Sequence, residues 1–258
     1  MRTLVAIAIV VASTAAARAA SACGVGGVGG AGVCDASEAI DAKTDAAARS
    51  RDRVGFAYGL TQSALFFGEG RRADTTRATM LLTWEHSFAR TWTLQVGVGT
   101  LLGGTIDTVF ASAVFRPGFL AAATLSHRIF EGERGARDGR PFVLTTYTLS
   151  FATTTAKAEG ADSTGYTALD FRFGLLVGTT FAGAITPYAA LRIFGGPAFW
   201  RWQDAPVIGT DAYKYEAGGG VVVSVGKRDA ATGGRVGFFV DGSFVGERNV
   251  RAGASMSF

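Results

Sequence analysis

Alternation between apolar and polar residues is the feature that most limits how this chain can fold, and it is clearest in the last nine residues. Every second residue from Val250 to Phe258 is apolar, and the residues between them are Arg251, Gly253, Ser255 and Ser257. A period of two places these sets on opposite faces of a β-strand. The sequence therefore predicts a final strand with one apolar face and one polar face, ending on an aromatic residue.

Nine further stretches show the same alternation. The expected strands cover residues 53–62, 76–86, 91–101, 113–128, 141–155, 166–180, 186–194, 213–225 and 235–244. Pro117 lies within the fourth and predicts a bulge or a strand end, because proline has no N–H to donate to the ladder. The pattern predicts an all-β chain of about ten antiparallel strands, and eight or twelve strands also fit.

The composition is apolar for a soluble protein, with 48% hydrophobic and 18% charged residues. Beyond the first 20 residues, no segment has the roughly 18 consecutive apolar residues of a membrane-spanning helix. Such a chain can still cross a membrane as a closed β-barrel, in which every backbone group is paired. The alternative is an exported soluble barrel with an apolar interior, and alternation alone does not separate the two.

The distribution of charged and aromatic residues favours the membrane barrel. Charged residues share the polar face and are expected to line the lumen, namely Arg77, Glu85, Arg116, Asp170, Arg172, Arg192, Lys214, Glu216, Asp241 and Arg251. The apolar face carries no charge at the strand centres, where an Arg or Lys facing lipid costs about 2–4 kcal/mol. Aromatic residues near strand ends are typical of interfacial girdles, namely Trp84, Trp92, Phe258, Phe199, Trp200, Trp202, Tyr213 and Tyr215.

With these strands, this polar face and the terminal aromatic residue, the chain resembles small bacterial (Gram-negative) outer-membrane β-barrel proteins over about residues 53–258. It matches no motif of a characterised subfamily. The resemblance implies an antiparallel up-and-down transmembrane β-barrel in the outer membrane, in contact with its lipid and lipopolysaccharide. It also implies that the outer-membrane assembly machinery recognises the C-terminal strand, and that the protein is a monomer.

The N-terminal 52 residues have a different character. Arg2, an apolar run from Leu4 to Val11 and the sequence Ala17-Arg18-Ala19 predict a signal peptide over residues 1–20. Residues 21–52 are rich in Gly and Ala and are expected to form a flexible periplasmic segment. An exported chain favours a disulfide between Cys23 and Cys34, with lipidation of Cys23 as the alternative.

The sequence gives little support for catalysis. His86 and His127 are the two histidines, and both are expected near periplasmic strand ends on the lipid-facing side. Their strand neighbours point to the opposite face, so a nucleophile–base pair is not expected. Neither a metal site nor a cofactor is expected, and the net charge of +4 gives no case for nucleic acid.

Three functions remain open from the sequence. The favoured one is a non-enzymatic barrel, structural or a narrow passive pore, whose lumen charges pair and largely plug it. The alternative is a barrel that binds or transports a lipid or hydrophobic ligand through aromatic outer loops, of which residues 195–212 form the longest. The loop from Gly68 to Arg72 is a candidate contact for lipopolysaccharide. A barrel hydrolase acting on lipid or peptide is the second alternative.

Overall fold

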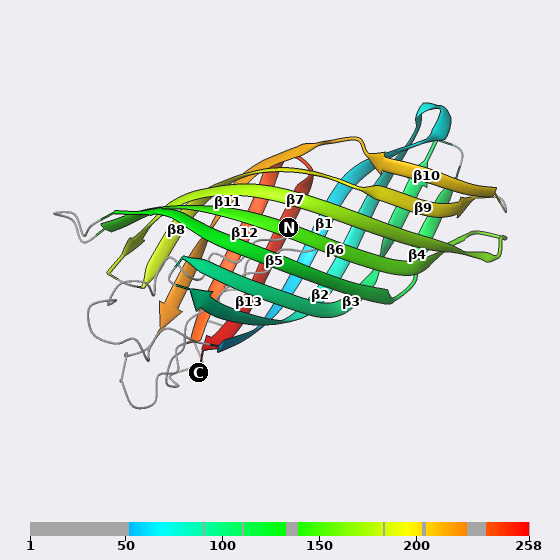
Figure 1. Ribbon diagram of the computed structural model, residues 1–258. Coiled ribbons are helices and arrows are strands. Elements are labelled where there is room, and N and C mark those ends of the chain that lie inside the picture. The colour runs from blue at the N-terminus through cyan, green and yellow to red at the C-terminus, as the bar shows by residue number, and fades with distance from the viewer. Residues whose placement is uncertain are drawn as a thin grey trace, which may run out of the picture.

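The computed structural model describes residues 52–89, 91–109, 111–132, 139–182, 184–202, 205–225 and 236–257, which form antiparallel β-structure almost throughout (Figure 1). The expected signal peptide, Cys23, Cys34 and Phe258 lie outside these ranges, as does the N-terminal segment apart from Asp52. Within them, no helix is long and apolar enough to cross a bilayer.

The chain runs back and forth along a barrel. Its strands are β1 (Asp52–Phe67), β2 (Arg71–Ala89), β3 (Trp92–Thr108), β4 (Ser112–Phe115), β5 (Gly118–Glu131), β6 (Gly139–Ala158), β7 (Ser163–Phe181), β8 (Ile185–Gly195), β9 (Pro197–Trp202), β10 (Ala205–Asp211), β11 (Tyr215–Val225), β12 (Val236–Gly246) and β13 (Arg248–Ser257). Three pairs continue one another after short breaks, namely β4–β5 at Arg116 and Pro117, β8–β9 at Gly196, and β10–β11 at residues 212–214. Joined in this way, the strands make about ten passes, which confirms the predicted count.

The barrel closes through its first and last strands. β1 pairs with β2 on one side and with β13 on the other, where Arg53 lies opposite Ser257 and Gln62 opposite Arg248. The remaining neighbours follow in the order β2, β3, β5, β6, β7, β8, β11, β12 and β13. A closed antiparallel ring leaves no free sheet edge. We call this part the proximal ring, because it contains the start of β1 and the end of β13.

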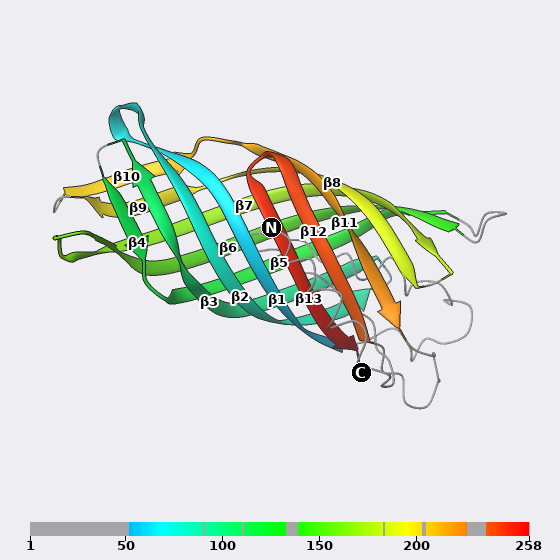
Figure 2. The ribbon, with the colours of Figure 1, turned by 180° about the vertical axis from the view of Figure 1, so that it is seen from behind.

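The other end of the barrel is a narrower ring. Beyond Gln62, β1 leaves β13 and pairs with β10, where Leu65 lies opposite Asp211 and Phe67 opposite Gly209. The ring there consists of β1, β2, β3, β4, β6, β7, β9 and β10. Figure 2 shows the β12–β13 hairpin ending part-way along β1 while the neighbouring strands continue. We call this eight-stranded part the distal ring.

The prediction of a long outer loop over residues 195–212 is wrong. Most of this stretch forms β9 and β10, which pair with each other and with β7 and β1. The candidate loop from Gly68 to Arg72 is likewise reduced to a 3₁₀ turn, Gly68–Gly70, before β2 begins. Glycine, proline and tryptophan obscured the strand pattern in the sequence, whereas pairing on both sides satisfies the backbone in the structure.

Gly246 makes the tight β12–β13 hairpin possible. Its φ is +77°, and a Cβ added there would lie 1.8 Å from the carbonyl oxygen of Tyr215. We expect Gly246→Ala to lower the free energy of unfolding by about 1–3 kcal/mol, measured by urea titration in detergent, because it combines backbone strain with a steric clash. Gly160 (φ +70°) is the matched control, since a Cβ there meets nothing within 4 Å. An equal loss in Gly160→Ala would show that the clash contributes nothing.

Candidate functional site

The candidate site is a network of buried charges across the middle of the barrel. Arg172 on β7 is its centre and is 4% exposed. Its Nε donates to Asp170 Oδ2 at 2.6 Å, and its Nη1 donates to Glu247 Oε1 at 2.7 Å and to Glu216 Oε2 at 3.2 Å. The guanidinium also lies 4.3 Å from the ring centroid of Phe194. One arginine therefore holds three carboxylates from β7, β11 and the hairpin tip.

Glu216 on β11 is the second centre of the network and is fully buried. It accepts hydrogen bonds from Arg192 and from Asn249 Nδ2, the latter at 2.9 Å. Arg251 Nη2 lies 3.5 Å from Glu216 Oε1, and its Nε lies 3.2 Å from Asp241 Oδ1. These contacts join the neighbouring strands β8, β11, β12 and β13 along one side of the lumen.

Three further contacts connect the network to Tyr188, Ser63 and Arg77. Tyr188 OH donates to Asp241 Oδ2 at 3.0 Å, and Arg77 Nη2 donates to Ser63 Oγ at 3.3 Å. Arg77 Nη2 also lies 3.9 Å from Glu247 Oε2. We refer to these residues together as the central network, namely Ser63, Arg77, Asp170, Arg172, Tyr188, Arg192, Glu216, Asp241, Glu247, Asn249 and Arg251.

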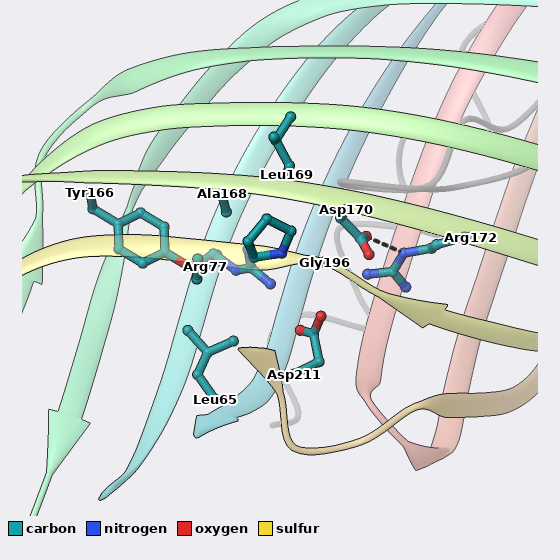
Figure 3. A pocket seen from close by; sticks show the side chains of 11 residues that line it. Leu65, Arg77, Tyr166, Ala168, Leu169, Asp170, Arg172, Gly196 and Asp211 are labelled. Atoms are coloured by element: carbon teal, nitrogen blue, oxygen red, sulfur yellow. Dashed lines mark hydrogen bonds and ion pairs between the residues drawn. The ribbon is translucent and has the colours of Figure 1, made fainter. Parts of the chain in front are cut away.

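A small cavity lies beside the network under the distal ring. Figure 3 shows Asp211, Asp170 and Arg172 around it, with Tyr166 and Arg77 alongside. Its volume is about 10 Å³, which corresponds to a single water molecule. Asp170 Oδ1 is buried there without a hydrogen-bond partner among the described residues. The site has room for solvent but not for an organic substrate.

Apolar clusters, with buried Thr and Ser side chains beside them, occupy the lumen on both sides of the central network. The proximal cluster consists of Ala57, Leu81, Leu120, Phe142, Leu144, Ala152, Leu176, Tyr188, Ala190, Val222 and Phe239. The distal cluster, inside the distal ring, consists of Leu65, Phe67, Ala73, Leu101, Ile106, Ala113, Phe115, Ala156, Tyr166, Ala168, Ala198 and Trp200. The order of these layers can be followed along β2. Its inward side chains Ala73, Arg77, Leu81 and Glu85 belong in turn to the distal cluster, the central network, the proximal cluster and the proximal end.

A second group of ion pairs closes the proximal end. Arg53 Nη1 donates to Glu85 Oε1 at 2.7 Å, and Gln95 Nε2 lies 3.5 Å from Glu85 Oε2. Arg128 Nη1 donates to Glu131 Oε2 at 3.0 Å. The lumen thus contains two layers of paired charge separated by a layer of apolar and hydroxyl side chains. Ionised side chains in a protein interior persist only when they are paired.

The structure places eight of the ten expected lumen charges inside the barrel: Arg77, Glu85, Asp170, Arg172, Arg192, Glu216, Asp241 and Arg251 are all buried. Arg116 and Lys214 are exposed on the outside instead, so this part of the prediction is wrong. Arg116 lies next to the inward-facing Phe115 in the distal ring, where apolar residues point inward. Lys214 lies in the break between β10 and β11, where Nζ donates to Thr210 Oγ1 at 2.7 Å.

The lumen also contains buried polar residues that were not predicted from the sequence, among them Arg53, Arg128, Glu247 and Asn249. Arg53 and Arg128 share the phase of the polar residues on their own strands, so alternation contained the signal. Glu247 had no such signal. It is the single residue between β12 and β13, and strand alternation does not predict the direction of a turn residue.

The residues expected to form an aromatic girdle differ in their exposure. Trp84, Phe199 and Tyr215 are 40%, 41% and 51% exposed, whereas Tyr213 is half-buried. Trp92 is half-buried and stacks on His127 with ring centroids 4.1 Å apart. The prediction that Trp200 belongs to the girdle is wrong, because its side chain is 4% exposed and belongs to the distal cluster. Trp202 ends β9, and its side chain lies outside the described part of the structure, as does Phe258.

Neither histidine lies in the central network. His86 Nδ1 lies 2.9 Å from Asp52 Oδ1, and its ring stacks on Trp84 with centroids 5.6 Å apart. Both His86 and His127 are half-buried near the proximal end. Within the described ranges, no three His, Cys, Asp or Glu side chains converge in a geometry that suits a metal ion.

The outer surface of the proximal ring is apolar. Large apolar side chains point outward along its strands and are more than a third exposed, for example Phe56, Leu82, Val98, Leu149, Phe171, Leu191 and Val240. No charged residue interrupts this surface at the described strand centres. A closed antiparallel barrel with an outward apolar band and charged side chains in its lumen is suited to span a lipid bilayer. The described residues form a β-barrel of the membrane-spanning type.

Comparisons with known proteins support no finer assignment. No family model matches the chain, and no curated protein matches its sequence. Among solved structures, the barrel is similar to the outer membrane protease OmpT from Escherichia coli, with a TM-score of 0.47 and 10% identity over 81% of this chain and 96% of that one. For the outer membrane protein OprG from Pseudomonas aeruginosa, the TM-score is 0.41 at 10% identity, covering 81% and 96%. For a TodX deltaS2S3 mutant, a monoaromatic hydrocarbon channel, the TM-score is 0.30 at 8% identity, covering 81% and 90%. Similarities of this size indicate nothing about what the barrel binds or does.

Proposed function

We propose that this barrel is a non-enzymatic structural protein of the outer membrane whose lumen is sealed against ions. The observation that carries the proposal is the central network between two apolar clusters. An ion passing along the axis would have to displace Arg172 and Glu216 from their partners and then cross the proximal or distal cluster. Both steps are costly, because removing one partner leaves an uncompensated buried charge.

The positions of the acid–base groups support a non-enzymatic role. General acid–base catalysis needs a titratable side chain within hydrogen-bond reach of a bound substrate. The carboxylates of the central network are already engaged by arginines, and the adjacent cavity of about 10 Å³ admits one water molecule. His86 and His127 pack against tryptophans near the proximal end. Nothing in this arrangement favours the hydrolase alternative.

Conductance in planar bilayers tests the sealed lumen. We expect the wild-type barrel to give no steady single-channel steps at 100 mV in 1 M KCl. A charge-balanced variant with Arg172, Arg192, Glu216 and Glu247 all replaced by serine is the positive control, because it removes two positive and two negative side chains. Once a heat-modifiable gel shift shows that this variant is folded, we expect it to conduct ions through the space that these side chains leave.

Steady, ion-selective steps from the wild-type barrel would contradict the proposal and favour a narrow passive pore. Folding of each preparation is checked on the same sample by its gel shift with and without heating. A silent wild type with a conducting variant would identify the central network as the barrier. Silence in both would place a sufficient barrier in the apolar clusters, which also agrees with a sealed barrel.

A further inference from the structure

The step between the two rings creates a groove on the outside of the barrel. β13 accompanies β1 only as far as Gln62, where its partner is Arg248, whereas β1 continues and pairs with β10 from Leu65 onward. Between these pairings the wall is held by Ala212 N, which donates to the carbonyl oxygen of Ala64 at 2.8 Å. The β12–β13 hairpin therefore ends at this level while β1 continues (Figure 2).

The groove at this step has a volume of about 540 Å³, which is within the range of small-molecule sites. Its lining comes from β1, β2, β12 and β13, namely Leu60, Gln62, Thr76, Ser243, Phe244, Arg248, Asn249 and Val250. Phe244 is 74% exposed, much more than most apolar side chains of the outer surface. A large aromatic ring beside an open groove is a candidate contact for a hydrocarbon chain.

Polar and apolar lining residues are separated along the strands. Leu60 and Val250 are register partners, and both point outward at the distal edge of the apolar band. Two residues further along, Gln62 lies opposite both Arg248 and Thr76. The groove is thus apolar toward the band and polar toward the distal ring. This is the order in which a lipid presents its chains and its head group.

Arg248 gives the polar end of the groove its charge. It is the one charged residue of the lining, and its side chain is exposed. The nearest acidic residue in sequence, Glu247, is 2% exposed and is bound to Arg172 inside the lumen. Arg248 therefore makes no ion pair among the described residues. A guanidinium suits phosphate oxygens because it donates two parallel hydrogen bonds.

From this geometry we propose that the groove binds one anionic phospholipid. Arg248 and Gln62 bind its phosphate-containing head group, and Leu60, Phe244 and Val250 bind an acyl chain. Below the head group, Nδ2 of Asn249, a residue of the central network, donates to Ser243 Oγ at 2.7 Å. The bound lipid covers the hairpin tip and shields the network at the point where the barrel wall steps inward.

Lipid retention tests the site without reference to conductance. The full barrel is folded in micelles that contain equal amounts of phosphatidylglycerol and phosphatidylcholine with identical acyl chains, and retained lipids are counted by native mass spectrometry. We expect one phosphatidylglycerol molecule to be retained about tenfold more than phosphatidylcholine. Arg248→Gln should abolish this preference, and Arg248→Lys should keep most of it. Phe244→Ala should lower the retention of both lipids several-fold.

Matched controls are available on the opposite wall. Arg116 is also exposed beyond the apolar band, and Phe119 is 49% exposed on β5. Arg116→Gln and Phe119→Ala should leave retention unchanged. Equal retention of the two lipids by the wild type, or equal losses in Arg116→Gln and Arg248→Gln, would overturn the proposal. Displacement of the lipid by millimolar inorganic phosphate would also overturn it, because the site would then recognise free phosphate without the chain.

Discussion

Arg172→Ala is expected to lower the free energy of unfolding of the barrel by about 3–5 kcal/mol, as is typical when one partner of a buried ion pair is removed. Arg172 is the centre of the network and holds Asp170, Glu216 and Glu247. Without it, the remaining ion pair of Glu247 among the described residues is the contact with Arg77 Nη2 at 3.9 Å, and Asp170 loses its ion pair with Arg172. The measurement is a urea titration of the folded barrel in detergent or lipid vesicles, followed by tryptophan fluorescence.

Arg201→Ala is the control for this prediction, because Arg201 is an exposed arginine on β9. Surface charges usually contribute less than about 1 kcal/mol, so a small change is expected. Arg172→Lys should recover only part of the stability, since an ammonium does not reproduce the planar guanidinium that reaches three carboxylates. If Arg172→Ala and Arg201→Ala lowered stability equally, the central network would not be a stabilising unit.

Trp200→Ala is expected to lower the free energy of unfolding by about 3–5 kcal/mol, because it leaves a large cavity in a packed core. Trp200 packs against Phe67 with ring centroids 5.7 Å apart, and Nε1 donates to Thr164 Oγ1 at 3.1 Å. The hydroxyl of Thr164 loses this donor in the variant. The same urea titration measures the loss, and the heat-modifiable gel shift should occur at a lower temperature.

Phe199→Ala is the control for Trp200, because the two residues are neighbours on β9 and point in opposite directions. Phe199 is 41% exposed, so its truncation should cost less than half as much. The comparison also distinguishes a core role for Trp200 from the role in an aromatic girdle that the sequence predicts. A larger effect in Phe199→Ala than in Trp200→Ala would show that β9 has the opposite orientation.

The distal ring explains most differences between prediction and structure. In the proximal ring, apolar residues such as Phe56 and Leu82 face outward, as the alternation was interpreted. In the distal ring, Phe67, Phe115 and Trp200 face inward, while Arg116 and Arg201 are exposed. Arg116 and Trp200 were misassigned because one rule, apolar outward, was applied along the whole chain. Alternation has the same period in both rings, so it does not reveal that the environment changes.

The sequence by itself predicted most of the strands, the approximate number of passes and the presence of two faces, because a period of two is a local property of the chain. It also predicted most of the lumen charges, since a residue's face follows from its place in its own strand. The tertiary structure alone decided that β1 exchanges β13 for β10, that Glu247 turns inward to Arg172, and that a groove opens beside Arg248. These features depend on which distant strands meet and where each one stops. The pairing of strands around the closed ring determines both, and no single stretch of sequence predicts that pairing.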